Sequence, residues 1–119
     1  MQGPDFSHVN SVKAAEDLVR RGDIERLLLL PSEFGGVEVP ENVIYVPTGI
    51  GAMKERIDRN VVGPLVAEGK ITRYSAVPEY QGDSFIPIAI RIEASDPGAF
   101  STVINIWGEA LNRNGPNAG

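Results

Sequence analysis

Apolar residues recur along this chain with two different periods, and the change between them separates a helical part from a strand-rich part. The first helical pattern covers residues 10–21, where apolar positions follow at spacings of three and four. Asn10 or Ser11 precedes it as an N-cap, and Gly22 follows where a left-handed C-cap belongs. The apolar face of this predicted helix consists of Val12, Ala15, Leu18 and Val19.

A second and longer helical pattern covers residues 49–68. Its apolar face is formed by Ile50, Met53, Ile57, Val61, Leu65 and Val66. Its polar face is formed by Lys54, Glu55, Asp58 and Arg59. Proline removes a backbone donor and crowds the preceding turn, so Gly63-Pro64 predicts a kink or a break in this helix.

Two short strands are predicted between these helices. Residues 25–30 contain an unbroken aliphatic run, which predicts a strand buried on both faces and ended by Pro31. Residues 43–46 form the second strand. The intervening segment, 31–42, is rich in Gly, Pro and Glu and is predicted to be a loop.

From residue 71 the period changes to two, which predicts three strands at 71–80, 85–94 and 100–107. The sequences QGDS (81–84) and DPG (96–98) join them with turn chemistry. The middle strand alternates most clearly, with Arg91 and Glu93 opposite an apolar face. That face consists of Ile86, Ile88, Ile90, Ile92 and Ala94.

These elements predict an α+β fold with a mainly antiparallel sheet of about five strands, two helices and a C-terminal three-strand meander. With 119 residues, the chain has the length of one domain, which we place at 1–111. The remaining segment, 112–119, is polar and is predicted to be a disordered tail.

Composition narrows the functional classes. The chain has no cysteine, so disulfides, thiol catalysis and thiolate metal sites are excluded. With 16 acidic and 11 basic residues the formal net charge is −5, and the basic residues are scattered, which argues against nucleic-acid binding and suits a basic partner. We find no signal peptide and no apolar run long enough to span a membrane, so we expect a cytoplasmic protein.

The sequence offers no recognisable catalytic motif and implies no cofactor. His8 is the single histidine, and no His, Cys or pair of carboxylates stands near it at metal-ligand spacing. Ser84 lies in a turn that lacks the G-x-S-x-G pattern of a nucleophilic serine, so we expect it to stabilise that turn.

Carboxylates and aromatic residues supply the candidate binding residues. If the 31–42 loop folds over the later turn, the carboxylates form either a site for a hard cation or a surface for a basic partner. If it does not, the carboxylates are solvated charge. The carboxylates are Glu33, Glu38, Glu41, Glu79 and Asp83. Tyr80 and Phe85 flank QGDS as possible anchors for a protein partner, and Trp107 is a further candidate on the last strand.

A longer stretch, about 26–94, resembles the C-terminal half of the DNA/RNA non-specific endonucleases, the ββα-metal group. The resemblance is carried by Gly35-Gly36, Glu41-Asn42, Gly69-Lys70, Tyr80 with Gly82 and Ser84, and Pro87. In such an enzyme a histidine general base would occupy the position of Leu28, and a metal-binding asparagine would stand near Gly51. Because both positions hold other residues, the resemblance implies a nuclease-like scaffold without the catalytic groups.

Three functions therefore remain open. The first is a noncatalytic protein-binding domain, with an immunity or inhibitor protein of a bacterial toxin system as its most concrete form. The second is a metal-binding protein or hydrolase that uses the carboxylates named above. The third is a self-associating structural protein with Trp107 at the interface, because Pro87 and Ala89 make the outer face of the meander less polar than a solvated sheet face.

Overall fold

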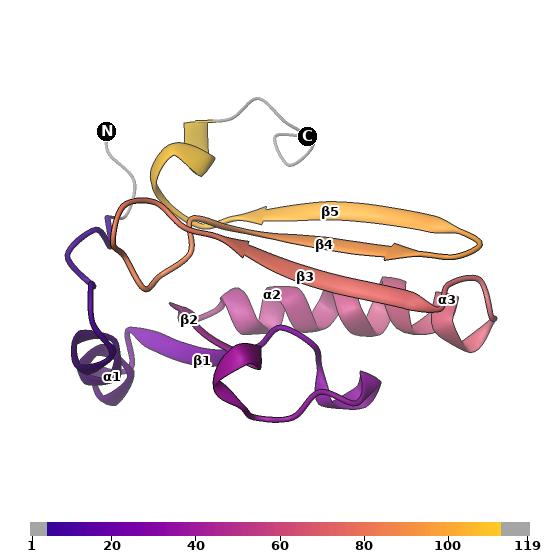
Figure 1. Ribbon diagram of the computed structural model, residues 1–119, viewed down its shortest axis with the longest axis horizontal. Helices are drawn as coiled ribbons and strands as arrows, with labels where there is room; N and C mark the ends of the chain where they lie inside the picture. Colours follow the sequence, from indigo (N-terminus) through magenta and orange to yellow (C-terminus); the bar gives the residue numbers. More distant parts are fainter. Residues whose placement is uncertain (1–4, 113–119) are drawn as a thin grey trace.

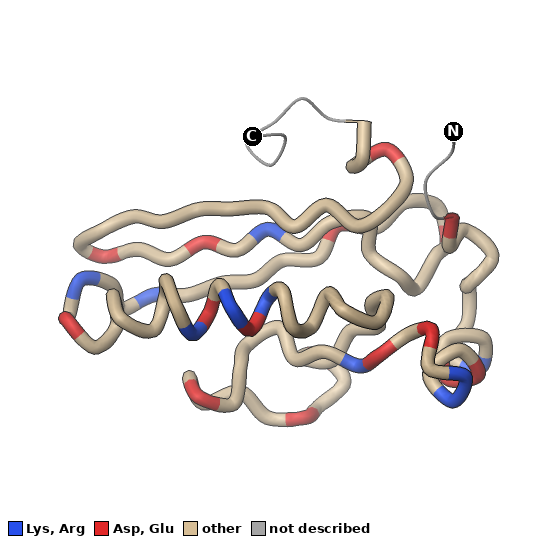
Figure 2. Tube along the Cα trace, turned by 180° about the vertical axis from the view of Figure 1, so that it is seen from behind, with Lys and Arg blue, Asp and Glu red and all other residues tan. Residues whose placement is uncertain are grey.

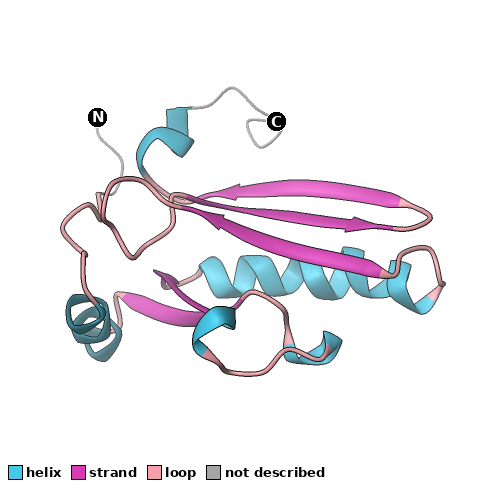
Figure 3. Cartoon of the chain, viewed as in Figure 1, coloured by secondary structure: helices cyan, strands magenta, loops and turns pink. Residues whose placement is uncertain are grey.

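Two antiparallel sheets, a short helix and a longer helix with an irregular turn form the architecture of the computed structural model, which describes residues 5–112 (Figure 1). The helices are α1 (Val12–Arg21), α2 (Ile50–Ile57) and α3 (Gly63–Ala67), and the strands are β1 (Ile24–Leu28), β2 (Val43–Pro47), β3 (Arg73–Glu79), β4 (Ala89–Ser95) and β5 (Ala99–Asn105). Strands β1 and β2 form one sheet, and β3-β4-β5 form a meander (Figure 3). The predicted α+β class, with five antiparallel strands, is confirmed.

Helix α1 forms where its sequence predicts it. The Ser11 hydroxyl accepts a hydrogen bond from the Ala14 N–H at 3.0 Å and caps the first turn. Gly22 ends the helix with φ of 84°, a conformation that residues with a side chain rarely adopt. Ala15 is buried, but Val12 is exposed, so the predicted apolar face was one residue too wide.

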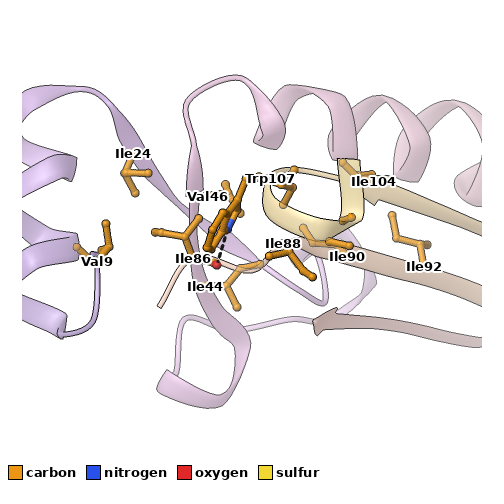
Figure 4. Close-up of a cluster of buried hydrophobic side chains, with 14 residues drawn as sticks. Val9, Ile24, Ile44, Val46, Ile86, Ile88, Ile90, Ile92, Ile104 and Trp107 are labelled. Carbon is orange, nitrogen blue, oxygen red and sulfur yellow. Dashed lines mark hydrogen bonds between the residues drawn. The ribbon is translucent and has the colours of Figure 1, made fainter. Parts of the chain in front are cut away.

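The core lies between β2, the meander and the segment that enters β4 (Figure 4). The alternating residues from Ile86 to Ala94 are all buried, which confirms the face predicted for that segment. Trp107 also lies in this core, with its Nε1–H donating to the Ile86 carbonyl at 2.9 Å. Its side chain is 2% exposed, so the prediction that Trp107 lies on an outer face is wrong.

The connection between β3 and β4 is wider than the sequence suggests. Strand β3 ends at Glu79 and β4 begins at Ala89, so residues 80–88 form a loop in place of a tight QGDS turn. Pro87 and Ala89 are buried and do not contribute to the exposed outer face of the meander, contrary to the prediction. The second joint behaves as expected, because Ser95 pairs with Ala99 directly across the DPG turn.

The long helix is continuous from Ile50 to Ala67, but it changes form in the middle. A π-helical turn, Asp58–Val62, separates α2 from α3, and the Gly63 N–H donates to the Asp58 carbonyl, five residues back. Pro64 follows directly and has no N–H to donate. The disturbance predicted at Gly63-Pro64 is therefore a π-helical turn, a feature frequently found at functional sites.

Basic and acidic residues are interspersed along this helix (Figure 2), and the face that it buries differs from the predicted one. Lys54 is 1% exposed and Asp58 is 3% exposed, although both belong to the predicted polar face. Met53, Val61 and Val66 belong to the predicted apolar face but are exposed. The helix is therefore rotated by about one residue relative to the prediction, and it packs a buried ion pair against the meander.

Loop 31–42 is closed by its last residue. The Asn42 side-chain oxygen accepts from the Leu30 N–H at 2.8 Å, and its Nδ2 donates to the Leu30 and Val37 carbonyls at 3.0 and 3.1 Å. Gly36 passes so close to Leu30 that a Cβ would lie 1.8 Å from the Leu30 carbonyl oxygen. Leu28 and Leu30 are only half-buried, so the double burial predicted for 25–30 is wrong.

Two further expectations concern the ends of the chain and membranes. The predicted tail, 112–119, lies outside the described residues except for Asn112, which ends the 3-10 helix η4 (Gly108–Asn112). In the part of the chain that the structure describes, no helix has the length and apolar character needed to cross a bilayer.

Candidate functional site

A groove of about 790 Å³ lies between segments that are far apart in the sequence. Its walls come from α1, β1, the end of loop 31–42, β2 and the 80–88 loop. Its volume falls within the range of about 300–1,000 Å³ that is common for binding sites. The 31–42 loop therefore approaches the later turn, which is one of the two arrangements that its sequence allows.

Several apolar side chains in the groove are exposed to solvent. Tyr80 is 46% exposed and Phe85 is 37% exposed, and Val12 and Val39 line the same groove with exposed side chains. Burial of such a cluster against a partner is favourable by roughly 25 cal/mol for each Å² of apolar surface. An exposed apolar cluster with polar residues around it is typical of an interaction site.

The groove is lined by a basic residue that has an ion-pair partner and by carboxylates that have none among residues 5–112. Arg26 is ion-paired with Glu16, and the Tyr45 hydroxyl donates to the same carboxylate at 2.6 Å. The hydrogen bond from Tyr45, followed by that from Arg26, lowers the pKa of Glu16, while Glu16 raises the pKa of Tyr45. Glu38 and Asp83 line the groove without an ion-pair partner among residues 5–112, so the uncompensated charge there is negative.

The loop that carries Tyr80 and Phe85 is anchored to the N-terminal segment. The Ser84 hydroxyl donates to the Phe6 carbonyl at 2.7 Å, and the Phe85 N–H donates to the Val9 carbonyl at 2.7 Å. Ser84 also accepts from the Ile86 N–H at 3.1 Å. These bonds hold the aromatic pair in place and show the turn-stabilising role predicted for Ser84.

The predicted partner-binding residues lie in four different surroundings. Glu38, Tyr80, Asp83 and Phe85 line the groove. Glu33 lies beside two other pockets, Glu41 is exposed at η2 (Pro40–Asn42) outside the groove, and Trp107 is in the core. Val12, Arg26 and Tyr45 line the groove but were not predicted, because their contribution depends on how α1 and β1 pack against β2.

A second cluster was also missed and consists of Lys54, Asp58 and Tyr74. The Lys54 ammonium donates to Asp58 Oδ2 at 2.6 Å and to the Tyr74 hydroxyl at 2.9 Å, and that hydroxyl donates to Asp58 Oδ1 at 2.7 Å. Burial lowers the pKa of Lys54 despite the neighbouring carboxylate. Burial, with the hydrogen bond to Asp58, raises the pKa of Tyr74 far above its ordinary range.

Lys54 and Asp58 of this triad line a smaller pocket of about 190 Å³ next to β1. Leu28 and Gly51, the two positions at which the nuclease resemblance would require histidine and asparagine, both line it. Gly51 leaves room for Glu25, which accepts the Gly49 and Gly51 N–H groups at the start of α2. Each group of the triad has a partner, which is the pattern of a buried structural network.

The carboxylates do not assemble into the cation site that was one of the alternatives predicted for them. Among residues 5–112, no three Asp, Glu or His side chains lie close enough to one another to hold a metal ion. Glu38 and Asp83 line the groove, whereas Glu33 lines two other pockets. Among these residues, the groove therefore combines exposed apolar side chains with two carboxylates, Glu38 and Asp83, that have no ion-pair partner.

Comparisons with known proteins identify no relative of this chain. No family model matches it, and neither the curated proteins nor the solved structures yield a match.

Proposed function

We propose that this chain is a noncatalytic protein-binding domain and that the groove is its contact surface. The observation that carries this proposal is the exposed pair Tyr80 and Phe85, held by a loop that is anchored through Ser84. Aromatic residues in fixed positions lose little conformational freedom when they bind, so they often contribute much of the affinity of an interface.

The charge of the groove supports a basic partner. Glu38 and Asp83 are exposed and unpaired among residues 5–112, whereas Arg26 is neutralised by Glu16. The net charge of −5 acts in the same direction and favours fast association with a cationic surface. The preferred occupant is therefore a protein segment with apolar side chains next to Lys or Arg.

Two of the alternatives from the sequence have less support. Self-association depended on Trp107, Pro87 and Ala89 as outer-face residues, and all three are buried. A nuclease-like activity would need an imidazole and an amide in the smaller pocket, where the chain has Leu28 and Gly51. The presence of Leu28 and Gly51 at these positions also supports the noncatalytic part of the proposal.

Peptide selection tests this function directly. A display library of random ten-residue peptides is selected on the wild-type chain, and the affinities of the enriched peptides are measured by calorimetry. We expect peptides with apolar residues beside Lys or Arg. Binding should fall at least about tenfold with Tyr80→Ser/Phe85→Ser, since two aromatic contacts are removed.

The matched control is Val77→Ser, which removes an apolar side chain that is 52% exposed on β3, away from the groove. Circular dichroism melts verify that all variants are folded. Enriched peptides that bind the aromatic double variant as tightly as the wild type would overturn the proposal, as would a library that yields no specific binder.

An immunity or inhibitor protein of a bacterial toxin system is the more specific form of this proposal. Its support is the acidic charge of a small domain, which suits a basic toxin. Co-expression with a toxin encoded next to the gene of this chain should restore growth, and Tyr80→Ser/Phe85→Ser should abolish that protection. Growth arrest that persists with the wild-type chain contradicts the immunity form.

A further inference from the structure

Strand β2 pairs with β1 along one edge and presents its other edge to the groove. The Leu29 N–H donates to the Asn42 carbonyl at 2.9 Å, and the Thr48 N–H donates to the Asp23 carbonyl at 3.2 Å. In an antiparallel pair, bonded and non-bonded positions alternate. Even-numbered residues of β2 therefore direct their backbone groups toward β1, and odd-numbered residues direct theirs to the opposite edge.

Few backbone groups on that opposite edge are already used. The Val43 N–H donates to the Pro40 carbonyl, and Pro47 has no N–H. The N–H and carbonyl of Tyr45 and the carbonyl of Val43 have no backbone or side-chain partner on this edge within residues 5–112. One donor and two acceptors are thus available in a short segment, while Pro47 prevents pairing from extending further.

These free groups border the groove. Val43 and Tyr45, which carry these groups, line it together with Ile44, which stands between them. Strand β1 reaches the groove through Arg26, and its residues Arg26, Leu27 and Leu28 line the 190 Å³ pocket, which is smaller than typical ligand sites. The edge of β2 is therefore the one with enough space for another segment of chain.

We infer that the groove binds an extended segment of a partner protein, which adds to β2 as a further strand paired with Tyr45. This inference rests on the proposed function and specifies how the partner binds. Backbone hydrogen bonds would supply part of the affinity, and alternate side chains of the segment would select the partner. Side chains on the face of Val43 and Tyr45 would meet Val12, because all three residues line the groove.

Charge complementarity defines the chemistry of that segment. Glu38 and Asp83 are the groove carboxylates without an ion-pair partner among the described residues, and both are exposed. A Lys or Arg beside the apolar positions of the segment would pair with them at the solvent-exposed rim. The occupant is therefore a strand of about five residues with alternating apolar side chains and at least one basic residue.

Two substitutions at one position isolate the backbone contribution. Tyr45→Val removes the ring and keeps the N–H, whereas Tyr45→Pro removes both, and proline is tolerated at an outward-facing edge position. The probes are the peptides selected on the wild-type chain. We expect Tyr45→Pro to bind them about tenfold more weakly than Tyr45→Val, since one hydrogen bond is lost and its acceptor is left unpaired.

Methylation of the peptide backbone provides a measurement that does not depend on the folding of either variant. Each amide nitrogen of the tightest peptide is methylated in turn, and affinities for the wild-type chain are measured by calorimetry. An added strand predicts alternation, in which methylation of an amide that faces β2 weakens binding at least tenfold and methylation of its neighbours has much less effect. Amide exchange at Tyr45 should also slow when the peptide is bound.

The outcomes separate the two proposals. Peptides that need Tyr80 and Phe85 but tolerate methylation equally at every position would overturn strand addition and leave the protein-binding groove intact. Equal affinities for Tyr45→Pro and Tyr45→Val, with both variants folded, would have the same meaning. If no selected peptide depends on the groove, both proposals fail.

Discussion

Removal of Asp58 should destabilise this protein more than any surface substitution on the same helix. Lys54 and Asp58 are almost completely buried, and Lys54 Nζ lies 2.6 Å from Asp58 Oδ2. Asp58→Ala therefore leaves an ammonium group in the core without its counter-ion. Loss of one partner of a buried ion pair typically costs about 3–5 kcal/mol. The domain as a whole is expected to have only about 5–15 kcal/mol of stability.

An upper limit for this cost follows from the chemistry of lysine. In the variant, Lys54 can avoid the buried charge by losing its proton, which costs about 1.4 kcal/mol for each pH unit below the pKa of about 10.4 in the unfolded chain. At pH 7 that limit is close to 5 kcal/mol. With an unfolding entropy of about 2.1 cal/mol/K per residue, a loss of 3–5 kcal/mol lowers the Tm by roughly 12–20 °C.

The pH dependence distinguishes this mechanism from simple loss of packing. Burial lowers the pKa of Lys54 in the folded wild type, and the Asp58 carboxylate raises it in part. Loss of that carboxylate lowers the pKa of Lys54 further in the variant, so its unfolded state binds more protons than its folded state over a wider pH window below about 10.4. The stability of Asp58→Ala should therefore rise with pH in that window. Its deficit relative to the wild type should shrink from about 4 kcal/mol at pH 7 to about 1–2 kcal/mol near pH 9.5.

Urea denaturation followed by the fluorescence of Trp107 measures these values. The control is Glu55→Ala, which removes an exposed ion pair with Arg59 at the same i,i+4 spacing on the same helix and should cost less than about 1 kcal/mol. Lys54→Met/Asp58→Leu/Tyr74→Phe replaces the whole network with apolar groups and should recover most of the lost stability. An Asp58→Ala cost below about 1 kcal/mol, or a deficit that does not change with pH, would refute the reasoning.

Three further predictions test other features of the fold. In spectrophotometric titration, Tyr74→Phe should remove the tyrosine that ionises last, because burial raises the pKa of Tyr74. The raised pKa also stabilises the fold below pH 10, and this contribution is lost as the pH rises further. An unchanged titration curve would contradict the prediction. Gly36→Ala should lower the free energy of unfolding, measured by urea denaturation, by about 1–3 kcal/mol, because the new Cβ would overlap the Leu30 carbonyl. Gly35→Asn should lower it less, because there is open space around Gly35 and asparagine tolerates its φ of 95°. Equal losses would show that the overlap is absent. Because Trp107 is 2% exposed, its emission should resist iodide quenching and shift to the red on unfolding, and strong quenching in the folded state would place it at the surface.

Local signals in the sequence were sufficient for most of the secondary structure. Ser11 caps the N-terminus of α1 and Gly22 caps its C-terminus, as predicted, because capping depends on atoms within one turn of the helix. The alternation from Ile86 to Ala94 correctly identified the buried face, because a strand has a period of two and leaves a single choice of face. The antiparallel pairing of the meander followed from consecutive strands that have no helix between them.

The groove depended on tertiary structure, although the sequence identified four of its residues. Tyr80 and Phe85 were candidates because they flank a turn, and Glu38 and Asp83 because they are charged loop residues. Their proximity, and the part played by Tyr45 and its open strand edge, follow from the packing of α1, β2 and the 80–88 loop. No periodicity within one segment encodes that arrangement.

The long helix shows most clearly which features the sequence determines and which depend on the tertiary structure. The sequence by itself determined that residues 50–67 are helical, because spacings of three and four residues recur throughout. Such spacings fit two adjacent faces, one through Met53 and Val61 and the other through Lys54 and Asp58. Only the tertiary structure decided between them, because Tyr74 on a distant strand provides the hydroxyl that completes the buried ion pair and makes its burial possible.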